Sequence, residues 1–550
     1  MQHLLDLHRD FDLGDEILMA RHGTAEGSEL QVGHVRYKVV IVPPMVNMES
    51  ATLDLLERFL TGGGKLFMMG DFPVLVDGEP SNRARKLAFA SGVVRLSPHR
   101  KHMEEELDLA LPRTVSVLNA ETGRQAANVL CMERRDGDST IIFVVNTDRE
   151  RGVPLKVLLP GRGQWQQLHC ETGQITGVAS SVSDGWTQVE CVLAPAGSAV
   201  LRKKRGRTAA GLTSREKVTE TVLQPKTGWK FRRLGPNSLI LDRCTWRVGT
   251  GPFEGPDFTL DAQCKWRQQL GMLSYTGTSA TGYQPYKLAR FPENLRPKGC
   301  VTLRYPFSVE TMPASEVHLV LEDRDVTVIR INGKLVETSA DGWFMDKSLQ
   351  TVPIQAFLHL GKNVVEVHTD VTVVRSMEDI YLIGNFGVDV VSHTITREPD
   401  RLRVGDWSRQ GYPFYADAMV YEAEVVLPKR IMGPVKIELP HFEGTVAAVW
   451  VNGKKAAIVG WRPYEADVTD FVKGGINLLG IEIVGSPRSL MGPRHSLQRY
   501  PVGVGPEEIN DTREPSYQLS PAGLMGEVRV MQYRFVDGGK HRTTGRPTVK

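Results

Sequence analysis

Residues 446–484 read VAAVWVNGKKAAIVGWRPYEADVTDFVKGGINLLGIEIV and predict two strands that each follow or precede a tight turn. Val446 to Val451 is an apolar run rich in β-branched residues, which favours a buried strand. Asn452-Gly453 follows directly, and because both residues tolerate positive φ, the dipeptide predicts a type I′ hairpin turn. Gly474-Gly475 predicts a second reversal, and 478–484 reads as another strand. The stretch therefore predicts part of an antiparallel β-sandwich.

The same order of features occurs twice, which indicates an internal repeat. The two Asn-Gly-Lys turns, at Asn332 and Asn452, lie about 120 residues apart. The first copy consists of Arg304-Tyr305-Pro306-Phe307, His318 to Glu322, Val326 to Ile331, Asn332-Gly333-Lys334 and Gly361-Lys362-Asn363-Val364. The second consists of Tyr421-Glu422-Ala423, Val435 to Leu439, Val446 to Val451, Asn452-Gly453-Lys454 and Gly475-Ile476-Asn477-Leu478. We expect one jelly-roll sandwich in residues 229–400 and a second in 401–550.

The N-terminal residues 1–112 predict an α/β domain. Tyr37 to Val42 reads as a buried strand, Ser50 as the N-cap of a helix with an apolar face, and Leu66 to Met69 as a second strand. This βαβ order predicts a parallel sheet. Two further helices are expected at 81–90 and 101–109.

Between these regions the pattern changes twice. Residues 113–202 contain short apolar runs separated by turn residues, which predict a small antiparallel β-sandwich, and the polar, basic residues 203–228 predict a linker. The length of 550 residues, with 53 Gly and 32 Pro, favours a multidomain, mainly β protein.

Four motifs in the last segment resemble the sugar-binding region of glycoside hydrolase families 106 and 2. They are Val451-Asn452-Gly453-Lys454, Trp461-Arg462-Pro463-Tyr464, Asp467-Val468-Thr469 and Gly475-Ile476-Asn477-Leu478-Leu479. The resemblance implies galactose-binding-like jelly rolls for the two repeats and a flavodoxin-like domain for residues 1–112. A glutamine amidotransferase, the other interpretation of that domain, needs a nucleophilic cysteine, and the first cysteine of the chain is Cys131.

In the families that the chain resembles, the catalytic carboxylates lie on an eight-stranded β/α barrel. A barrel needs about 250 residues of alternating strand and helix, and only the first 112 residues alternate. The resemblance implies that the chain begins where such a barrel ends. The catalytic residues are therefore unknown, with a group of acidic residues that lies beside the barrel in relatives as weak candidates: Asp10, Asp12, Asp15 and Glu16.

Sugar binding needs an aromatic face for the ring and a few polar groups for its hydroxyls. In the last segment the candidates for these roles are Tyr415, Asp417, Trp461, Tyr464, Arg494 and His495. Trp461 and Tyr464 have a second interpretation, in which they only fix their loop to the sandwich.

Composition and spacing exclude several other classes of protein. A net charge of +3 gives no reason to expect nucleic-acid binding, and no run of 18 apolar residues or signal-peptide pattern is present, so a soluble protein of undetermined location is expected. The six cysteines lack C-x-x-C spacing and are expected to be buried free thiols, with one or two disulfides as the alternative. No metal or cofactor is predicted, although a loop such as 322–325 can hold calcium in a β-sandwich.

The resemblance thus implies a carbohydrate-active protein related to glycoside hydrolases that binds glycans or has an accessory role, with either a separate catalytic subunit or a second copy of the chain as its protein partner. The alternative is an active exo-glycosidase, of the β-galactosidase or α-L-rhamnosidase type, with a site at a domain or subunit interface. A structural protein with neither property is the third interpretation.

Overall fold

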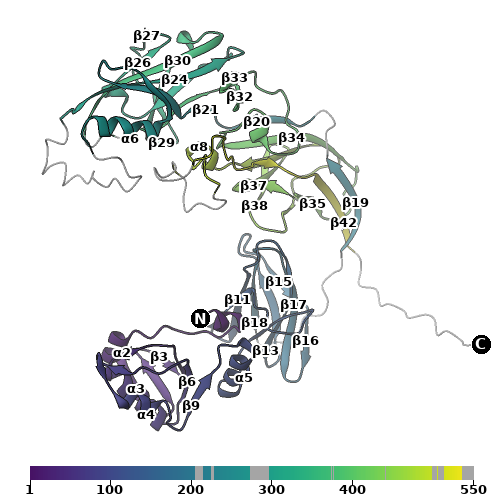
Figure 1. Ribbon diagram of the computed structural model, residues 1–550. Helices are drawn as coiled ribbons and strands as arrows, with labels where there is room; N and C mark the ends of the chain where they lie inside the picture. The colour runs from purple at the N-terminus through teal and green to yellow at the C-terminus, as the bar shows by residue number, and fades with distance from the viewer. Residues whose placement is uncertain are drawn as a thin grey trace, which may run out of the picture. The chain divides into compact units, whose positions relative to one another are not determined.

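The chain forms two compact units built mainly of antiparallel β-sheet (Figure 1). Met1–Ser214 belongs to unit 1 and Arg215–Val536 to unit 2. The computed structural model describes residues 1–204, 215–223, 228–272, 296–372, 375, 377–439, 441–497, 505 and 513–535. The rest of the predicted linker and of the two predicted jelly rolls lies outside the described residues. The finer division of the chain at residues 112, 202, 228 and 400 stays a prediction.

Unit 1 begins with an α/β part that contains the predicted parallel sheet. Strands β4 (Val39–Val42), β6 (Lys65–Met69) and β9 (Val93–Leu96) pair in parallel in that order. Helix α3 (Ser50–Thr61) lies between β4 and β6 in the chain and buries Leu53, Leu56 and Phe59, so the βαβ unit is confirmed. Ser50 is not the N-cap, because Glu49 occupies that position and Asp77 Oδ1 accepts the Ser50 amide hydrogen at 2.8 Å.

The other helices of unit 1 are shorter. Helices α4 (Asn82–Leu87) and α5 (Arg100–Ala110) form within the predicted regions or one residue outside them, and Ser81 caps α4 by accepting from Arg83 N. The remaining elements of this part are α1 (Gln2–Asp6), α2 (Glu16–His22), β1 (Gly23–Glu26), β2 (Glu29–Val32), β3 (Val35–Tyr37), β5 (Asn47–Met48), β7 (Leu75–Val76) and β8 (Glu79–Pro80).

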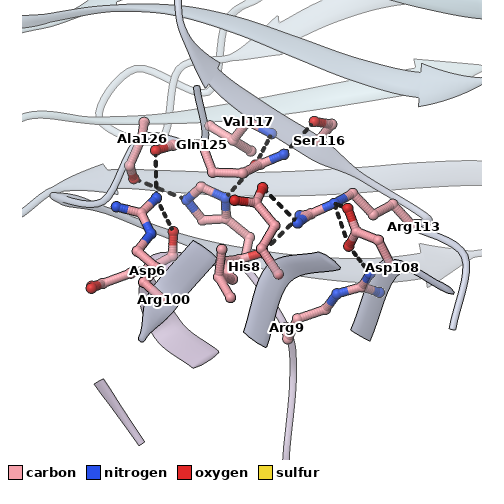
Figure 2. A network of polar contacts seen from close by, with 12 residues as sticks. Asp6, His8, Arg9, Arg100, Asp108, Arg113, Ser116, Val117, Gln125 and Ala126 are labelled. Atoms are coloured by element: carbon pink, nitrogen blue, oxygen red, sulfur yellow. Dashed lines mark hydrogen bonds and ion pairs between the residues drawn. The ribbon is translucent and has the colours of Figure 1, made fainter. Parts of the chain in front are cut away.

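The second part of unit 1 consists of two antiparallel sheets around one core that includes Trp165. One sheet contains β10 (Ser116–Asn119), β13 (Val153–Pro160), β17 (Trp186–Leu193) and β16 (Ser180–Ser183). The other contains β11 (Val129–Asp136), β12 (Ser139–Asn146), β18 (Ser198–Lys204), β14 (Gln164–Leu168) and β15 (Ile175–Val178). Figure 2 shows the polar network that joins this sandwich to the helical part, in which His8 contacts Gln125 and Ala126 and Arg113 contacts Asp108. His8 Nε2 also lies 2.9 Å from Val129 O, and Arg113 donates to Leu7 O at 2.8 Å.

Part of the predicted linker is a strand. Residues 215–223 form β19 (Arg215–Leu223), which pairs antiparallel with β42 (Val528–Phe535) near the other end of unit 2. This pairing is non-local, which is why the composition of the stretch, polar and basic, gave no sign of it.

Unit 2 contains two cores, each enclosed by two sheets. The first sandwich has one sheet of β21 (Asn237–Leu241), β31 (Ile380–Gly384), β25 (His318–Leu321), β29 (Asp346–Pro353) and β28 (Gly342–Phe344). Its other sheet contains β23 (Glu254–Phe258), β22 (Arg243–Val248), β24 (Gly299–Val309), β30 (Gly361–Val371), β26 (Thr327–Ile331) and β27 (Lys334–Leu335), joined by β32 (Gly387–Asp389) and β33 (Thr394–Thr396). Helix α6 (Thr259–Gln269) adds Trp266 to this core.

The second sandwich is built in the same way. One sheet contains β20 (Lys230–Arg233), β34 (Ala418–Leu427), β40 (Gly475–Val484), β37 (Val446–Val451) and β38 (Lys454–Val459). The other contains β19, β42, β35 (Val435–Glu438) and β39 (Glu465–Asp467). The inward-facing Val449, Ile481 and Val530 belong to one shared core. The multidomain, mainly β class is therefore confirmed.

The two Asn-Gly turns share one set of hydrogen bonds, which we call the Asn clamp. In the second sandwich, Asn452 donates from Nδ2 to Asn477 Oδ1 at 2.9 Å and accepts from Leu478 N at 3.1 Å. In the first, Asn332 donates to Asn363 Oδ1 at 2.8 Å and accepts from Val364 N at 3.0 Å. Both turn asparagines have positive φ, 53° and 51°, followed by glycines with φ of 81°, as the sequence predicts.

Candidate functional site

A run of aromatic side chains crosses unit 2 beside strand β34. Trp407 begins the short helix η6 (Trp407–Arg409), whose N-cap Asp406 accepts from Ser408 N at 2.9 Å. The chain then leads through Tyr412 and Tyr415 into β34. Ring centroids are 5.7 Å apart for Trp407 and Tyr415, 5.9 Å for Tyr415 and Tyr412, and 5.8 Å for Tyr412 and Phe231 of the neighbouring strand β20. The contacts are edge-to-face, the geometry that the charge distribution of aromatic rings favours.

Trp407 and Tyr415 line a cavity of about 240 Å³, which we call the Trp407 cavity. Trp407 is 1% and Tyr415 2% exposed, so each ring presents only a small part of its apolar surface to the cavity. The polar lining comes from three segments, with Glu443 and Thr445 before β37, Ser486 and Ser489 after β40, and Ser520 before β42. The cavity is therefore assembled from parts of the chain that lie far apart in sequence.

The polar groups of the cavity are held in place by local hydrogen bonds. Glu443 Oε1 lies 3.0 Å from His441 Nε2, and the Thr445 hydroxyl donates to Gly485 O at 2.7 Å. Ser486 Oγ accepts from Arg488 N at 3.2 Å, which leaves its hydroxyl hydrogen as a donor. The cavity thus offers a carboxylate acceptor and hydroxyls next to an aromatic wall.

The predicted sugar-binding residues do not come together. Tyr415 lines the cavity, and its hydroxyl donates to Ala418 O at 2.6 Å. Asp417 accepts from the amide of Ala418 at 2.7 Å and does not line the cavity. Trp461 is 66% exposed, whereas Tyr464 packs on Phe442 with ring centroids 4.5 Å apart. Tyr464 therefore packs its loop against the sandwich, whereas Trp461 is exposed to solvent and does not line the cavity.

Arg494 and His495 lie inside the protein, each only 2% exposed. His495 Nε2 is 3.1 Å from Asp242 Oδ2, and Tyr517 donates to Asp242 Oδ1 at 3.0 Å. Arg494 also contacts Asp379. Burial opposes ionisation of Asp242, but the hydrogen bond with His495 and the charge of Arg494 outweigh it and lower the pKa of this carboxyl. A buried ionic network of this kind is internally satisfied, and solvent reaches its centre hardly at all.

The weak catalytic candidates near the N-terminus serve local structure. Asp15 caps helix α2 by accepting from Leu18 N at 2.9 Å, and Glu16 accepts from Glu49 N at 3.0 Å. Tyr37 donates to Asp12 Oδ2 at 2.7 Å, while Asp10 is exposed. Three of the four carboxylates are thus engaged separately rather than as a pair facing one space.

Two other carboxyl groups, those of Glu378 and Glu322, have raised pKa values. Burial, reinforced by the charges of Glu322 and Asp379, raises the pKa of Glu378 to about 7. Burial also raises the pKa of Glu322, which follows strand β25. The sequence placed Glu322 in a turn that can also hold calcium and gave Glu378 no role, because their proximity depends on the fold.

The described residues contain neither a metal-binding group of side chains nor a helix that could span a membrane. No group of three or more His, Cys, Asp or Glu side chains there is placed to hold a metal ion, and no helix there is long and apolar enough to cross a membrane. No disulfide bond joins two cysteines in the described residues, and only Cys244 is buried while Cys170 is exposed, so the expectation that all are buried is wrong.

The solved structures that are similar to this chain include several glycoside hydrolases. The rhamnosidase of Novosphingobium sp. PP1Y matches 96% of this chain at 14% identity with a TM-score of 0.47, and this chain spans 36% of that enzyme's length. The α-L-rhamnosidase of Streptomyces avermitilis, solved with L-rhamnose, is 10% identical with a TM-score of 0.22 over 77% of this chain and 40% of its own. The α-L-fucosidase isoenzyme 2 of Paenibacillus thiaminolyticus is 13% identical with a TM-score of 0.25, over 38% and 44%. A scan against protein-family models finds no match, and neither does a search of curated proteins.

Proposed function

We propose that this protein is carbohydrate-active and binds one sugar unit of a glycan in the Trp407 cavity. The observation that carries the proposal is the lining of the cavity, in which Trp407 and Tyr415 stand beside Glu443, Thr445 and Ser486. Sugar sites combine an aromatic surface for the C–H groups of the ring with a few fixed polar groups for its hydroxyls. A volume of about 240 Å³ lies just below the range of drug-sized ligand sites, which begins at roughly 300 Å³, and suits a single ring.

The proposal extends to the architecture. The repeated Asn clamp supports assigning both sandwiches of unit 2 to the galactose-binding-like jelly rolls, and the parallel β4-β6-β9 sheet supports a flavodoxin-like N-terminal domain. On this proposal the chain serves as a glycan-binding or accessory part of a carbohydrate-active assembly, with a separate catalytic subunit or a second copy of itself as partner.

Calorimetric titration of the full chain with methyl galactoside, glucoside and rhamnoside tests the proposal. We expect saturable binding of at least one glycoside and an affinity loss of about tenfold or more in Glu443→Ala, since the change removes a carboxylate acceptor from the cavity. Glu424→Ala, which alters an exposed glutamate on β34, is the matched control and should bind as the wild type does. Equal binding by Glu443→Ala and wild type would exclude this carboxylate from the site.

One observation favours the second candidate, an active exo-glycosidase. A general acid that works near neutral pH needs a carboxyl group whose pKa is raised by its surroundings, and Glu378 has one of about 7. Turnover of nitrophenyl galactosides and rhamnosides that Glu378→Gln abolishes, while the Glu424→Gln control retains it, would establish this function. Absence of turnover in the wild type leaves sugar binding as the function.

A further inference from the structure

A second hollow in unit 2 has the chemistry of a saccharide site. It encloses about 560 Å³ next to the end of strand β20, and we call it the Arg233 cleft. Its walls include Phe231 and Arg233 of β20, Asn385 in the turn between β31 and β32, and Glu398 after β33. None of the residues that the sequence singled out lines it.

Arg233 is held rigidly at this cleft. Its side chain is 9% exposed, its Nε donates to Glu398 Oε1 at 2.5 Å, and its Nη1 donates to Gly235 O at 2.5 Å. Its Nη2 donates to Asn385 Oδ1 at 3.0 Å. These bonds use three of the five N–H donors of a guanidinium, whose planar fork is suited to paired acceptors.

The partners of Arg233 are oriented by the same bonds. Glu398 Oε1 also accepts from the Tyr412 hydroxyl at 2.8 Å, so both of these hydrogen bonds fall on one oxygen of the carboxylate. Oε2 is then the acceptor that remains for a ligand, on a side chain that is 31% exposed. Because Asn385 accepts through Oδ1, its Nδ2 group is the end that can donate.

Charge balance in the cleft selects a neutral ligand. Glu398 neutralises Arg233, and the exposed Asp400 lies 3.3 Å from Arg397. A site for phosphate or carboxylate would present an arginine whose charge is not already compensated. Phe231, packed edge-on against Tyr412, adds an apolar surface to this lining of paired charges.

We propose that the Arg233 cleft binds a neutral saccharide unit through a pair of adjacent hydroxyls. In this arrangement Glu398 Oε2 accepts from one hydroxyl, Asn385 Nδ2 and the Arg233 guanidinium donate to its neighbour, and Phe231 contacts the C–H face of the ring. The ligand class rests on the proposed function, but the residues of the cleft are separate from those of the Trp407 cavity.

The two sites share a wall through Tyr415. Tyr415 lines the Trp407 cavity with its ring, and its hydroxyl accepts from Leu234 N at 3.1 Å and Gly235 N at 3.3 Å, two residues that line the Arg233 cleft. The aromatic run from Trp407 to Phe231 continues this shared wall.

Titration of two variants of the full chain with methyl glycosides and with di- and trisaccharides tests the inference. Glu398→Gln keeps an oxygen for Arg233 and Tyr412 but replaces the second acceptor by an amide. Asn385→Asp keeps the acceptor for Arg233 but removes the amide donor. Each should weaken binding at the Arg233 cleft by about tenfold or more, with Glu422→Gln on β34 as the unchanged control, and the melting temperature of each variant checks that it is folded.

Comparison with a blocked Trp407 cavity separates the two proposals. If Ser486→Phe, which fills that cavity, abolishes all binding and Glu398→Gln and Asn385→Asp bind as the wild type does, the cleft inference is wrong and the proposed function stands. If Ser486→Phe binds as the wild type does while both cleft variants lose binding, the cleft inference stands and the Trp407 cavity is wrong. Absence of saccharide binding in the wild type overturns both.

Discussion

The two sandwiches of unit 2 are alike at one end of their central strands and different at the other. At the turn end, Asn477 accepts from Asn452 Nδ2 and Lys473 N and donates to Lys473 O and Gly475 O. Asn363 makes the same four bonds with Asn332, His359 and Gly361. The clamp closes the loop between distant strands in the same way in both copies, so it is a property of the fold.

At the opposite end the two copies carry different chemistry. In the second sandwich the segments before β37 and after β40 supply Glu443, Thr445 and Ser486 to the Trp407 cavity. In the first, the segments before β26 and after β30 carry Glu322 and Glu378, the carboxyl groups with raised pKa. The repeat therefore conserves the end that determines the fold, while the end available for binding or catalysis differs.

The largest expected effect comes from breaking the clamp. Asn477→Ala should lower the free energy of unfolding of unit 2 by about 2–4 kcal/mol, because it leaves buried partners of a fully buried side chain without hydrogen bonds. Asn363→Ala should cost a similar amount, and Asn82→Ala, at an exposed helix position, less than about 0.5 kcal/mol. Denaturant unfolding measures all three, and a large difference between the two clamp variants would show that the copies are not equivalent.

The second-largest expected effect is a pH-dependent stability that Glu378 causes in the first sandwich. A carboxyl group whose pKa is raised on folding favours the native state below its unfolded pKa, and this stability is lost as pH rises through the folded value of about 7. Glu378→Gln mimics the protonated group and should be more stable than wild type by about 1–3 kcal/mol at pH 8, with little difference at pH 4. Thermal unfolding between pH 4 and pH 8 measures the stability difference between Glu378→Gln and wild type, with the exposed Glu424→Gln as control. A stability difference that does not change with pH would contradict the raised pKa of Glu378.

Blocking the Trp407 cavity tests which of the two sandwiches binds the glycoside. Ser486→Phe places a ring in the Trp407 cavity and should reduce glycoside affinity by about tenfold, or about 1.4 kcal/mol. Ser348→Phe makes the same substitution at an exposed position of β29 in the first sandwich and should leave affinity unchanged. Titration calorimetry decides between the sandwiches, since the reverse outcome would place the site in the first one.

The smallest expected effect is the pH dependence of stability that His8 causes in unit 1. Burial lowers the pKa of His8, so the native state loses stability as pH falls below about 6.5, the ordinary value, where the unfolded chain takes up the proton more readily. His8→Asn should remove this pH dependence, and asparagine tolerates the positive φ of 54° at this position. Melting temperatures at pH 7.5 and 5.5 give the slope for each protein, and equal slopes would exclude His8 as the cause.

Local signals were predicted well from the sequence, and contacts between distant segments were not. The Asn452-Gly453 turn is determined by its own two residues, whereas its partner Asn477 follows 25 positions later. His495 was predicted as a sugar contact because its loop motif is polar, yet it is buried against Asp242, which precedes it by 253 positions. Tyr415 was found from its aromatic character, but Trp407 and Ser486 were missed because four separate segments assemble the cavity.

A crystal structure of the chain with the tightest-binding methyl glycoside tests the central claim most directly. We predict the sugar ring in the Trp407 cavity, with its C–H groups against Trp407 and Tyr415 and its hydroxyls within hydrogen-bond distance of Glu443 and Ser486. An empty cavity at a saturating glycoside concentration, with the ring bound in the first sandwich beside Glu322 and Glu378, would contradict it.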